Sequence, residues 1–273
     1  MSRPSMFEPL RKIFRSRAAG RPLPAVPDGS RYYAVGDVHG RLDLFERLID
    51  AIEHDDREAA DADSTVVLLG DLVDRGPDSA GVVARARAWQ SERKLRLLAG
   101  NHEEMFLNAL DDVGVLRHFL RHGGRQTALS YGIARDAYDR ATMEEVQAML
   151  LEAVPQEDRR FLAKAKNYHL AGDYLFVHAG IAPNIPLAEQ EDHHLRWIRE
   201  PFLEHTEPHQ HFVVHGHTIT DGIDERANRI GIDTGAYQSG RLTALVLEGT
   251  SRRIIQAVER DGAIFIETGA DRA

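Results

Sequence analysis

Five short polar motifs interrupt the sequence, and each follows a run of apolar residues. They are GDVHG (36–40), GDLVDRG (70–76), GNHE (100–103), VHAG (177–180) and HGHT (215–218). A turn needs glycine, asparagine or aspartate, but it does not need two aspartates, an asparagine and several histidines in this order. Carboxylate, amide and imidazole groups are suitable ligands for Mn²⁺, Fe²⁺ or Zn²⁺. Together the motifs predict a metal site.

Each of these motifs stands at the end of a predicted strand. In the first third of the chain, strands are predicted at YYAV (32–35), STVVLLG (64–70) and LRLLAG (95–100). A helix at 43–54, and a second helix that Asp78 or Ser79 could cap, separate them. This alternation predicts a parallel sheet, and ligands bind such sheets at the carboxyl ends of the strands. We therefore expect the five motifs to converge.

The rest of the chain divides into a helical part and a strand-rich part. Residues from 103 to about 170 have helical patterns, including EEMFLNAL and MEEVQAMLLEAV, and predict a helical insertion. Short apolar runs separated by glycine and polar turns then follow at 174–180, 211–218, 229–233, 241–248 and 252–259. They predict a second sheet packed on the first.

Composition narrows the class of protein. The 273 residues fit one large α/β domain or two small ones, and the net charge of −9 argues against a nucleic-acid-binding surface. The absence of cysteine excludes disulfides and thiolate catalysis and favours a cytoplasmic location. No apolar run is long enough to span a bilayer, so we expect no stable membrane association. The proline-rich, arginine-rich residues 1–30 predict a disordered basic tail before a domain at 31–270.

The ordered motifs resemble a known family. GDVHG, GDLVDRG and GNHE, followed by two later histidines, are similar to the phosphoprotein phosphatase branch of the calcineurin-like metallophosphoesterases. HTIT and IDTGAYQSGRLTAL bring the chain nearest to the bacterial and phage lambda-type serine/threonine protein phosphatases. The resemblance spans residues 31 to 250. It implies an α/β fold, a β-sandwich of two mixed sheets flanked by helices, with the helical insertion at about 104–170.

The resemblance also implies two divalent metal ions, with Mn²⁺ preferred and Fe or Zn as alternatives. The implied ligands are Asp37 and His39 for the first ion, Asp71 as the bridge, and Asn101, His178 and His217 for the second. His217 is preferred over His215 because it directly precedes Thr218, but both histidines remain candidates at this point.

By the same resemblance, His102 would be the general acid, and Asp74 would keep it protonated and oriented. Arg75 and Arg199 would bind phosphate oxygens. One position departs from the family pattern, because Ala99 stands where many members have arginine before GNHE. The candidates for a substitute are Arg96, Arg121 and Arg125.

We expect a phosphomonoester hydrolase in which a metal-bridging hydroxide attacks phosphorus. Its substrates would be phosphorylated proteins or peptides, as for a serine/threonine phosphatase that also accepts phosphotyrosine, or small phosphoesters. The alternative is a symmetrical dinucleoside polyphosphate (Ap4A) hydrolase. Asp74 favours the phosphatase, because those hydrolases tend to lack this acid, whereas Ala99 weakens the preference. A non-catalytic binding module is the remote alternative.

Two further segments have both a structural and a functional interpretation. RHGGRQTALSYG (121–132) contains a glycine pair typical of a turn, but its basic residues could line the cleft. Asp233 and Tyr237 could support the metal ligands from behind.

Overall fold

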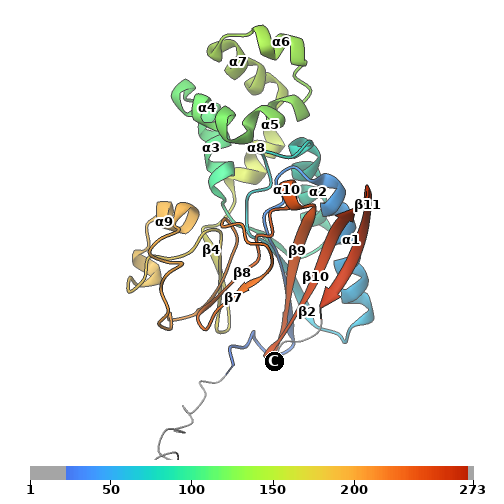
Figure 1. Ribbon diagram of the computed structural model, residues 1–273, viewed down its shortest axis with the longest axis vertical. Coiled ribbons are helices and arrows are strands. Elements are labelled where there is room, and N and C mark those ends of the chain that lie inside the picture. The colour runs from blue at the N-terminus through green and yellow to red at the C-terminus, as the bar shows by residue number, and fades with distance from the viewer. Residues whose placement is uncertain (1–22, 270–273) are drawn as a thin grey trace, which may run out of the picture.

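The structure, a computed structural model, describes residues 23–269. Two β-sheets pack face to face and helices flank them (Figure 1). The larger sheet has the order β11-β10-β9-β1-β2-β3. Its strands are β1 (Ser30–Val35), β2 (Asp63–Leu68), β3 (Leu95–Leu97), β9 (Arg241–Glu248), β10 (Ser251–Arg260) and β11 (Ala263–Gly269).

The second sheet has five strands, in the order β4-β5-β6-β8-β7. They are β4 (Tyr168–Ala171), β5 (Tyr174–Val177), β6 (Phe212–His215), β7 (Asp224–Glu225) and β8 (Arg229–Gly231). Both sheets are mixed: β1 runs parallel to β2 but antiparallel to β9, and β5 runs parallel to β6 but antiparallel to β4. The expected α/β sandwich of two mixed sheets is confirmed.

One expectation about the sheets is wrong. The later strands were all expected in a second sheet, but β9, β10 and β11 join the first sheet through β1. An apolar run fixes which residues are buried, but it carries no information on which strand it pairs with. The central strand β1 is therefore flanked by β2, which follows it in sequence, and by β9, some 200 residues later.

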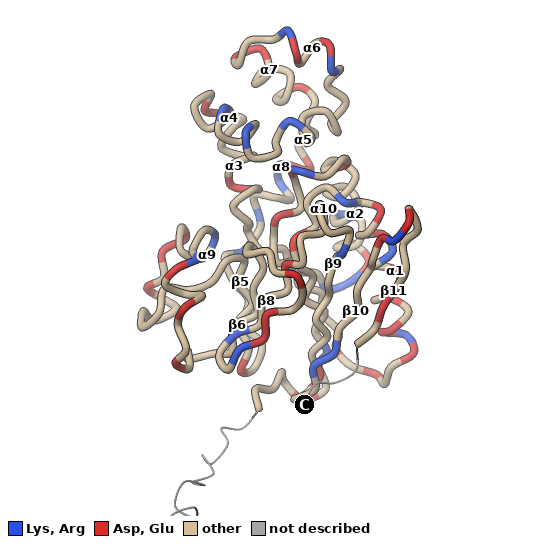
Figure 2. Tube along the Cα trace, in the orientation of Figure 1, with Lys and Arg blue, Asp and Glu red and all other residues tan. Residues whose placement is uncertain are grey.

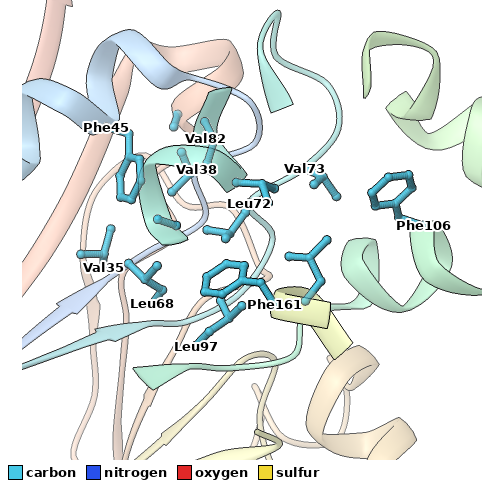
Figure 3. Close-up of a cluster of buried hydrophobic side chains, with 14 of the residues drawn as sticks. Val35, Val38, Phe45, Leu68, Leu72, Val73, Val82, Leu97, Phe106 and Phe161 are labelled. Carbon is cyan, nitrogen blue, oxygen red and sulfur yellow. The ribbon is translucent and has the colours of Figure 1, made fainter. Parts of the chain in front are cut away.

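Helices cover the outer face of the larger sheet. In α1 (Leu42–Glu58) the residues Leu44, Leu48 and Ile52 recur at helical spacing and are fully buried. In α2 (Ser79–Glu92), Asp78 is the N-cap and accepts a hydrogen bond from the amide of Gly81 at 2.8 Å. Phe45 and Val82 from these helices belong to the same buried cluster as Leu68 of β2, Phe106 and Phe161 (Figure 3).

A helical insertion rises above the sandwich in Figure 1, with α6 and α7 farthest from the sheets. Its elements are α3 (Asn101–Ala109), α4 (Val113–Phe119), a kinked turn η1 (Leu120–Gly124), α5 (Arg125–Ser130), α6 (Arg135–Arg140), α7 (Met143–Ala153) and α8 (Gln156–Ala163). Phe106 stacks on Phe119 with ring centroids 5.3 Å apart, which ties α3 to α4. The helices occupy 101–163, against the predicted 104–170.

Three short elements complete the described part: the 3₁₀ turn η2 (Leu187–Glu189), α9 (Asp192–Trp197) and α10 (Ala236–Ser239). Within residues 23–269, no helix combines the length and apolar composition that a membrane crossing requires.

The start of the domain precedes the predicted boundary at residue 31. Val26 is 2% exposed, and its amide donates to the carbonyl of Gly249 at 3.0 Å. The carbonyl of Ala25 accepts from the amide of Asp173 at 2.9 Å. These contacts attach the chain to both sheets before β1 begins. Residues 1–22 of the predicted tail lie outside the described residues.

Candidate metal centre

The five polar motifs converge at the carboxyl ends of five strands. Asp37 and His39 follow β1, Asp71 follows β2, and Asn101 opens α3 after β3. From the second sheet, His178 follows β5 and His217 follows β6. All six predicted ligands are buried, with no more than 7% of any side chain exposed. The larger sheet supplies four of them and the smaller sheet two, so the site lies where the two sheets meet.

The backbone at this site is in an uncommon conformation. His39, Asp71, Asp74, Arg75 and His217 have positive φ angles of 45°, 52°, 75°, 70° and 62°. A non-glycine residue in the left-handed region costs energy and is retained only where the surroundings impose it. These residues account for five of the seven positive-φ positions outside glycine in the described chain.

Asp71 is the centre of the arrangement. Two groups, His39–Asp71–His102 and Asp71–His178–His217, each have ligand atoms within 4.8 Å of one another. Asp71 Oδ2 lies 3.5 Å from His39 Nε2, and its Oδ1 lies 3.4 Å from His178 Nε2. One carboxylate therefore presents one oxygen to each group, as a ligand shared by two ions can do.

The imidazoles are oriented as metal ligands usually are. His39 Nδ1 donates to the carbonyl of Val73 at 2.8 Å, and His178 Nδ1 donates to that of Leu69 at 2.8 Å. In both rings the unprotonated nitrogen is then Nε2, which faces Asp71. Histidines that bind metal commonly donate their other ring N–H to a carbonyl in this way. His217 Nε2 is buried and has no hydrogen-bond partner among the described residues. These orientations fit divalent ions.

The electrostatic environment of these histidine and aspartate side chains also suits them to bind metal ions. Burial lowers the pKa of His39 and His178 and lowers that of His217 to about 3, so these rings are neutral, as ligation requires. Burial alone would raise the pKa of Asp71, but its interactions with the surrounding histidines, which include His102 with its raised pKa, hold the pKa of Asp71 below its usual value. The oxygen and nitrogen donor set suits Mn²⁺, Fe²⁺ or Zn²⁺.

The two remaining predicted ligands lie beside these groups. The side-chain oxygen Asn101 Oδ1 is 3.0 Å from His178 Nε2. Asp37 lies outside both groups and accepts hydrogen bonds from the amide of His217 at 3.0 and 3.2 Å. Its nearest charged neighbours include Asp233 and Asp71, and burial followed by these charges raises its pKa.

His102 and Asp74 form a buried pair, as expected. His102 Nδ1 donates to Asp74 Oδ2 at 2.6 Å, and Thr127 donates to Asp74 Oδ1 at 2.6 Å. Burial would lower the pKa of His102, but the carboxylates of Asp71 and Asp74 outweigh it and raise that pKa. This environment favours a ring that carries a proton, which is what a general acid needs.

Arg75 lies between two of these rings. Its Nη1 is 2.8 Å from His39 Nε2, and its Nη2 is 3.0 Å from His102 Nε2. Tyr237 supports the guanidinium, with the ring centroid 4.9 Å from the Arg75 Cζ, and also contacts the His39 ring. A guanidinium can only donate, so these contacts are incompatible with a metal on His39 Nε2 and with a proton on His102 Nε2.

Arg199 and His215 differ in their relation to the site. Arg199 is exposed in the turn after α9, and its charge acts on His178 and His217 without a direct contact. His215 Nδ1 donates to the carbonyl of Gly216 at 3.0 Å, and its Nε2 accepts from Arg229 at 3.3 Å. His217, not His215, therefore faces Asp71.

Glu103 has a structural role that the sequence did not reveal. Its carboxylate accepts hydrogen bonds from the amides of Asp71 and Leu72 at 2.7 Å each, of Val73 at 3.3 Å and of Gly100 at 3.2 Å. It thus holds the Asp71 loop against the start of α3. Burial, with the charge of Asp71, raises its pKa to about 7. Its only sequence signal is its position at the end of GNHE.

Asp233 lies against the metal centre. It is 1% exposed; Oδ1 accepts from the amide of Gly235 at 2.9 Å, and Oδ2 is buried without a partner among the described residues. Burial raises its pKa to about 6. Together with Tyr237, it occupies the supporting position that IDTGAY indicated.

Two of the three candidate substitutes for an arginine at position 99 are engaged elsewhere. Arg125 pairs with Asp139 at 3.0 Å and lies over Tyr138. Arg96 is exposed on β3, where its charge acts on Tyr32 and His169. Arg121 is exposed in the η1 turn and is the remaining candidate.

A two-sheet α/β sandwich with this cluster at its strand ends defines a hydrolase of the metallophosphoesterase type. Residues 30–241 match the calcineurin-like phosphoesterase family, and the chain belongs to this family.

Two curated relatives point to different substrates. The chain is 31% identical to a symmetrical bis(5'-nucleosyl)-tetraphosphatase of Paracidovorax citrulli, over 63% of this chain and 48% of that protein. It is 27% identical to serine/threonine-protein phosphatase 1 of Salmonella typhimurium, over 77% of this chain and 89% of that protein. The chain spans about half the length of the tetraphosphatases it matches.

A solved structure shows the same fold. A crystal structure assigned provisionally to a diadenosine tetraphosphatase superposes with a TM-score of 0.59 at 21% identity, covering 90% of this chain and 98% of that one. The broad family expected from the motifs is thus confirmed. The narrower assignment to serine/threonine protein phosphatases is not, because the more similar relatives are symmetrical tetraphosphatases.

Proposed function

We propose that the chain hydrolyses phosphoesters with the help of two divalent ions held by the six predicted ligands. The observation that carries this proposal is the position of Asp71, whose two oxygens face separate histidine groups at 3.4 and 3.5 Å. The family match supports hydrolysis as the reaction. Two bound ions would lower the pKa of a water molecule and neutralise charge on the phosphate.

The protein side chains would do the rest. His102, held protonated by Asp74, would donate a proton from Nε2 to the leaving oxygen. Arg75, once turned from His39, would bind phosphate oxygens with two parallel N–H groups. Arg199, at the exposed edge beside His178, would add a second positive charge. These roles follow from charge and position.

For the substrate, our first candidate is a symmetrical dinucleoside polyphosphate. Several relatives that share 31–32% identity with the chain are symmetrical bis(5'-nucleosyl)-tetraphosphatases. Since the chain matches only about half of their length, their substrate is carried over as a proposal.

The second candidate is a phosphomonoester of serine, threonine or tyrosine in a protein or peptide. The specific observation in its favour is the buried Asp74–His102 pair at 2.6 Å. An alkoxide is a poor leaving group and gains much from a positioned acid, whereas a nucleotide phosphate leaves readily without one. The Salmonella phosphatase, matched over 89% of its length, also supports this candidate.

A substrate comparison on the Mn²⁺-loaded protein tests the proposal. Diadenosine tetraphosphate and phosphoserine, phosphothreonine and phosphotyrosine peptides are compared by kcat/KM, with identification of the products. The first candidate predicts preference for the dinucleotide with ADP as the sole product. Preference for peptides would replace it with the second. No turnover of any phosphoester would reject hydrolysis and leave a binding module.

Metal content provides the second measurement. Asp71→Asn should lower bound metal from about two ions per chain and abolish turnover, because the shared ligand is lost. Asp63→Asn is the matched control, since Asp63 lies on β2 with 65% of its side chain exposed. Normal metal content in Asp71→Asn would refute the bridging role.

A further inference from the structure

We propose that the basic stretch Arg117–Arg125, at the edge of the metal centre, binds phosphate groups of the substrate beyond the one that is cleaved. The inference rests on the proposed phosphoester hydrolysis and names the part of the substrate that this stretch recognises. Its ligand is a chain of linked phosphates, as in a dinucleoside polyphosphate.

The first observation is an asymmetry of charge. Residues 113–135 contain no aspartate or glutamate, although the whole chain has a net charge of −9. The same residues include Arg117, His118, Arg121, His122, Arg125 and Arg135. In Figure 2 basic residues mark the stretch from α4 to α5, whereas α6 and α7, farther from the sandwich, carry acidic residues as well. The positive charge is therefore local to one part of the insertion.

The second observation is direct contact with the active-site loop. The chain kinks at the end of η1, where Gly123 and Gly124 lie, and the Gly123 carbonyl accepts from the backbone amide of Arg75 at 3.2 Å. Gly123 has a φ of 112°, and a Cβ there would lie 2.7 Å from that amide nitrogen. Only glycine allows so close an approach.

The side chains before Gly123 form an exposed edge of arginine and histidine groups. The rings of His118 and His122 have centroids 4.0 Å apart, and His122 Nδ1 donates to the carbonyl of His118 at 2.8 Å. Both side chains are exposed, and His118 is near enough to His102 for their charges to interact. The pair is therefore exposed near the general acid.

Arg121 lies between these histidines in sequence and is exposed. Unlike Arg125, which is paired with Asp139, Arg121 forms no ion pair with any carboxylate in residues 23–269. An unpaired guanidinium beside two imidazoles is a set of donors that matches phosphate oxygens. Because Arg75 would hold the cleaved phosphate, the next phosphate along a linked chain would meet this edge.

The test compares one phosphate with three. The Mn²⁺-loaded protein hydrolyses p-nitrophenyl phosphate in the presence of inorganic orthophosphate or inorganic tripolyphosphate, with free Mn²⁺ held constant. The inhibition constant of tripolyphosphate should rise about tenfold in Arg121→Gln and in the double variant His118→Asn/His122→Asn. This is the change expected when one charge-assisted hydrogen bond is lost. The inhibition constant of orthophosphate should change by less than about twofold.

The matched control is Arg140→Gln, an arginine of α6 in the same insertion that pairs with Asp136. It should change neither inhibition constant. Equal changes for both anions, or no change for tripolyphosphate, would overturn the proposal. Weaker binding of an acidic phosphopeptide with unchanged tripolyphosphate inhibition would also overturn it, since the edge would then recognise peptide carboxylates.

A second readout separates this inference from the proposed function. Calorimetric titration of the Mn²⁺-loaded variants with tripolyphosphate measures affinity without turnover. If the wild-type protein binds tripolyphosphate but hydrolyses no phosphoester, the proposed function fails and the comparison of variants still decides the inference. If the variants bind tripolyphosphate as tightly as the wild type, the inference fails whatever the activity.

Discussion

At the scale of single residues, the site is held in a strained backbone by a few buried bonds. A residue in the left-handed region costs roughly 1–3 kcal/mol, and His39, Asp71 and His217 all adopt it. Asp71 is held there because its amide donates to Glu103 at 2.7 Å. The amide of His39 donates to the carbonyl of Asp71 at 2.9 Å, which links two of the strained positions. Hydrogen bonds within the protein thus hold these ligand positions in place.

The Asp74–His102 pair yields a prediction about pH. The pKa of His102 is raised because Asp71 and Asp74 outweigh burial, so the ring keeps its proton up to a pH above 6.5. Asp74→Asn removes one carboxylate and lowers that pKa. The alkaline limb of kcat for a poor leaving group, such as phenyl phosphate, should therefore shift to lower pH. The pH–rate profile checks this shift.

Two comparisons sharpen that experiment. With p-nitrophenyl phosphate, whose leaving group needs less protonation, the loss of rate in Asp74→Asn should be smaller. Asp111→Asn, at an exposed position of the insertion, is the control variant and should keep the wild-type profile. An alkaline limb at the same pH in Asp74→Asn and wild type would show that His102 is not the acid.

The types of the site residues and their places at strand ends could be predicted from the sequence, but the contacts between their side chains could not. Alternating apolar and polar segments were enough to place Asp37, Asp71 and Asn101 at strand ends. They could not choose between His215 and His217, because both lie close to the end of β6. The choice depends on Arg229, whose guanidinium reaches His215 from β8. Contacts between distant loops leave no periodic signal in the chain.

At the scale of elements, the helical insertion contributes to the active site directly. Thr127 of α5 donates to Asp74 Oδ1 at 2.6 Å and accepts from the Asp74 amide at 2.9 Å. Ser79, at the start of α2, accepts from the same amide at 2.9 Å. The Asp74–His102 pair, our proposed general acid and its partner, is therefore held between α2 and α5.

Thr127→Val tests this role with almost no change in volume. The valine cannot donate to Asp74, so one buried carboxylate oxygen loses its partner at a cost of about 1–3 kcal/mol in the free energy of unfolding. Because Asp74 then positions His102 less well, kcat on phenyl phosphate should fall more than KM changes. Urea unfolding and steady-state kinetics measure the two effects.

Thr127→Ser supplies the control, since it keeps the hydroxyl group. It should restore kcat to near the wild-type value. If Thr127→Ser and Thr127→Val lower kcat equally, packing rather than the hydrogen bond to Asp74 would account for the loss. An unchanged kcat in Thr127→Val would show that α5 does not help to position His102.

The elements themselves were largely predictable, but their partners were not. The strands after residue 174 were identified from short apolar runs, and β5, β6, β8, β9 and β10 form there. Their division between two sheets depends on long-range pairing, such as Tyr33 of β1 opposite Val246 of β9. No local pattern specifies that partner, so the expectation that β9 and β10 belong to the second sheet was wrong.

At the scale of the whole molecule, the metal centre depends on both sheets. Ligands after β1, β2 and β3 meet ligands after β5 and β6 only when the sandwich core is formed. That core includes Ala34 and Val67 from one sheet and Phe176 and Val214 from the other. Ions that bind only the assembled site stabilise the folded state. The sandwich could be expected from the family resemblance, whereas the contact between Gly123 of the insertion and Arg75 required the structure.

The second sheet also makes the fold sensitive to acid. His215 is 1% exposed, and burial lowers its pKa to about 4. The ring is neutral in the fold, because its Nε2 accepts from Arg229, which can only donate. In the unfolded chain an ordinary histidine titrates near 6.5. Between pH 6.5 and 4 the unfolded chain therefore takes up a proton that the folded chain does not.

The free energy of unfolding should consequently fall as pH decreases through this window, by about 1.4 kcal/mol per pH unit for His215 alone. Urea unfolding of chelator-treated protein at pH 7, 6 and 5 gives the slope. His215→Asn should reduce that slope by about this amount, whatever its effect on stability at pH 7. His54→Asn, at an exposed position of α1, should leave the slope unchanged. Equal slopes in His215→Asn and wild type would mean that His215 is protonated in the fold, contrary to its bond with Arg229.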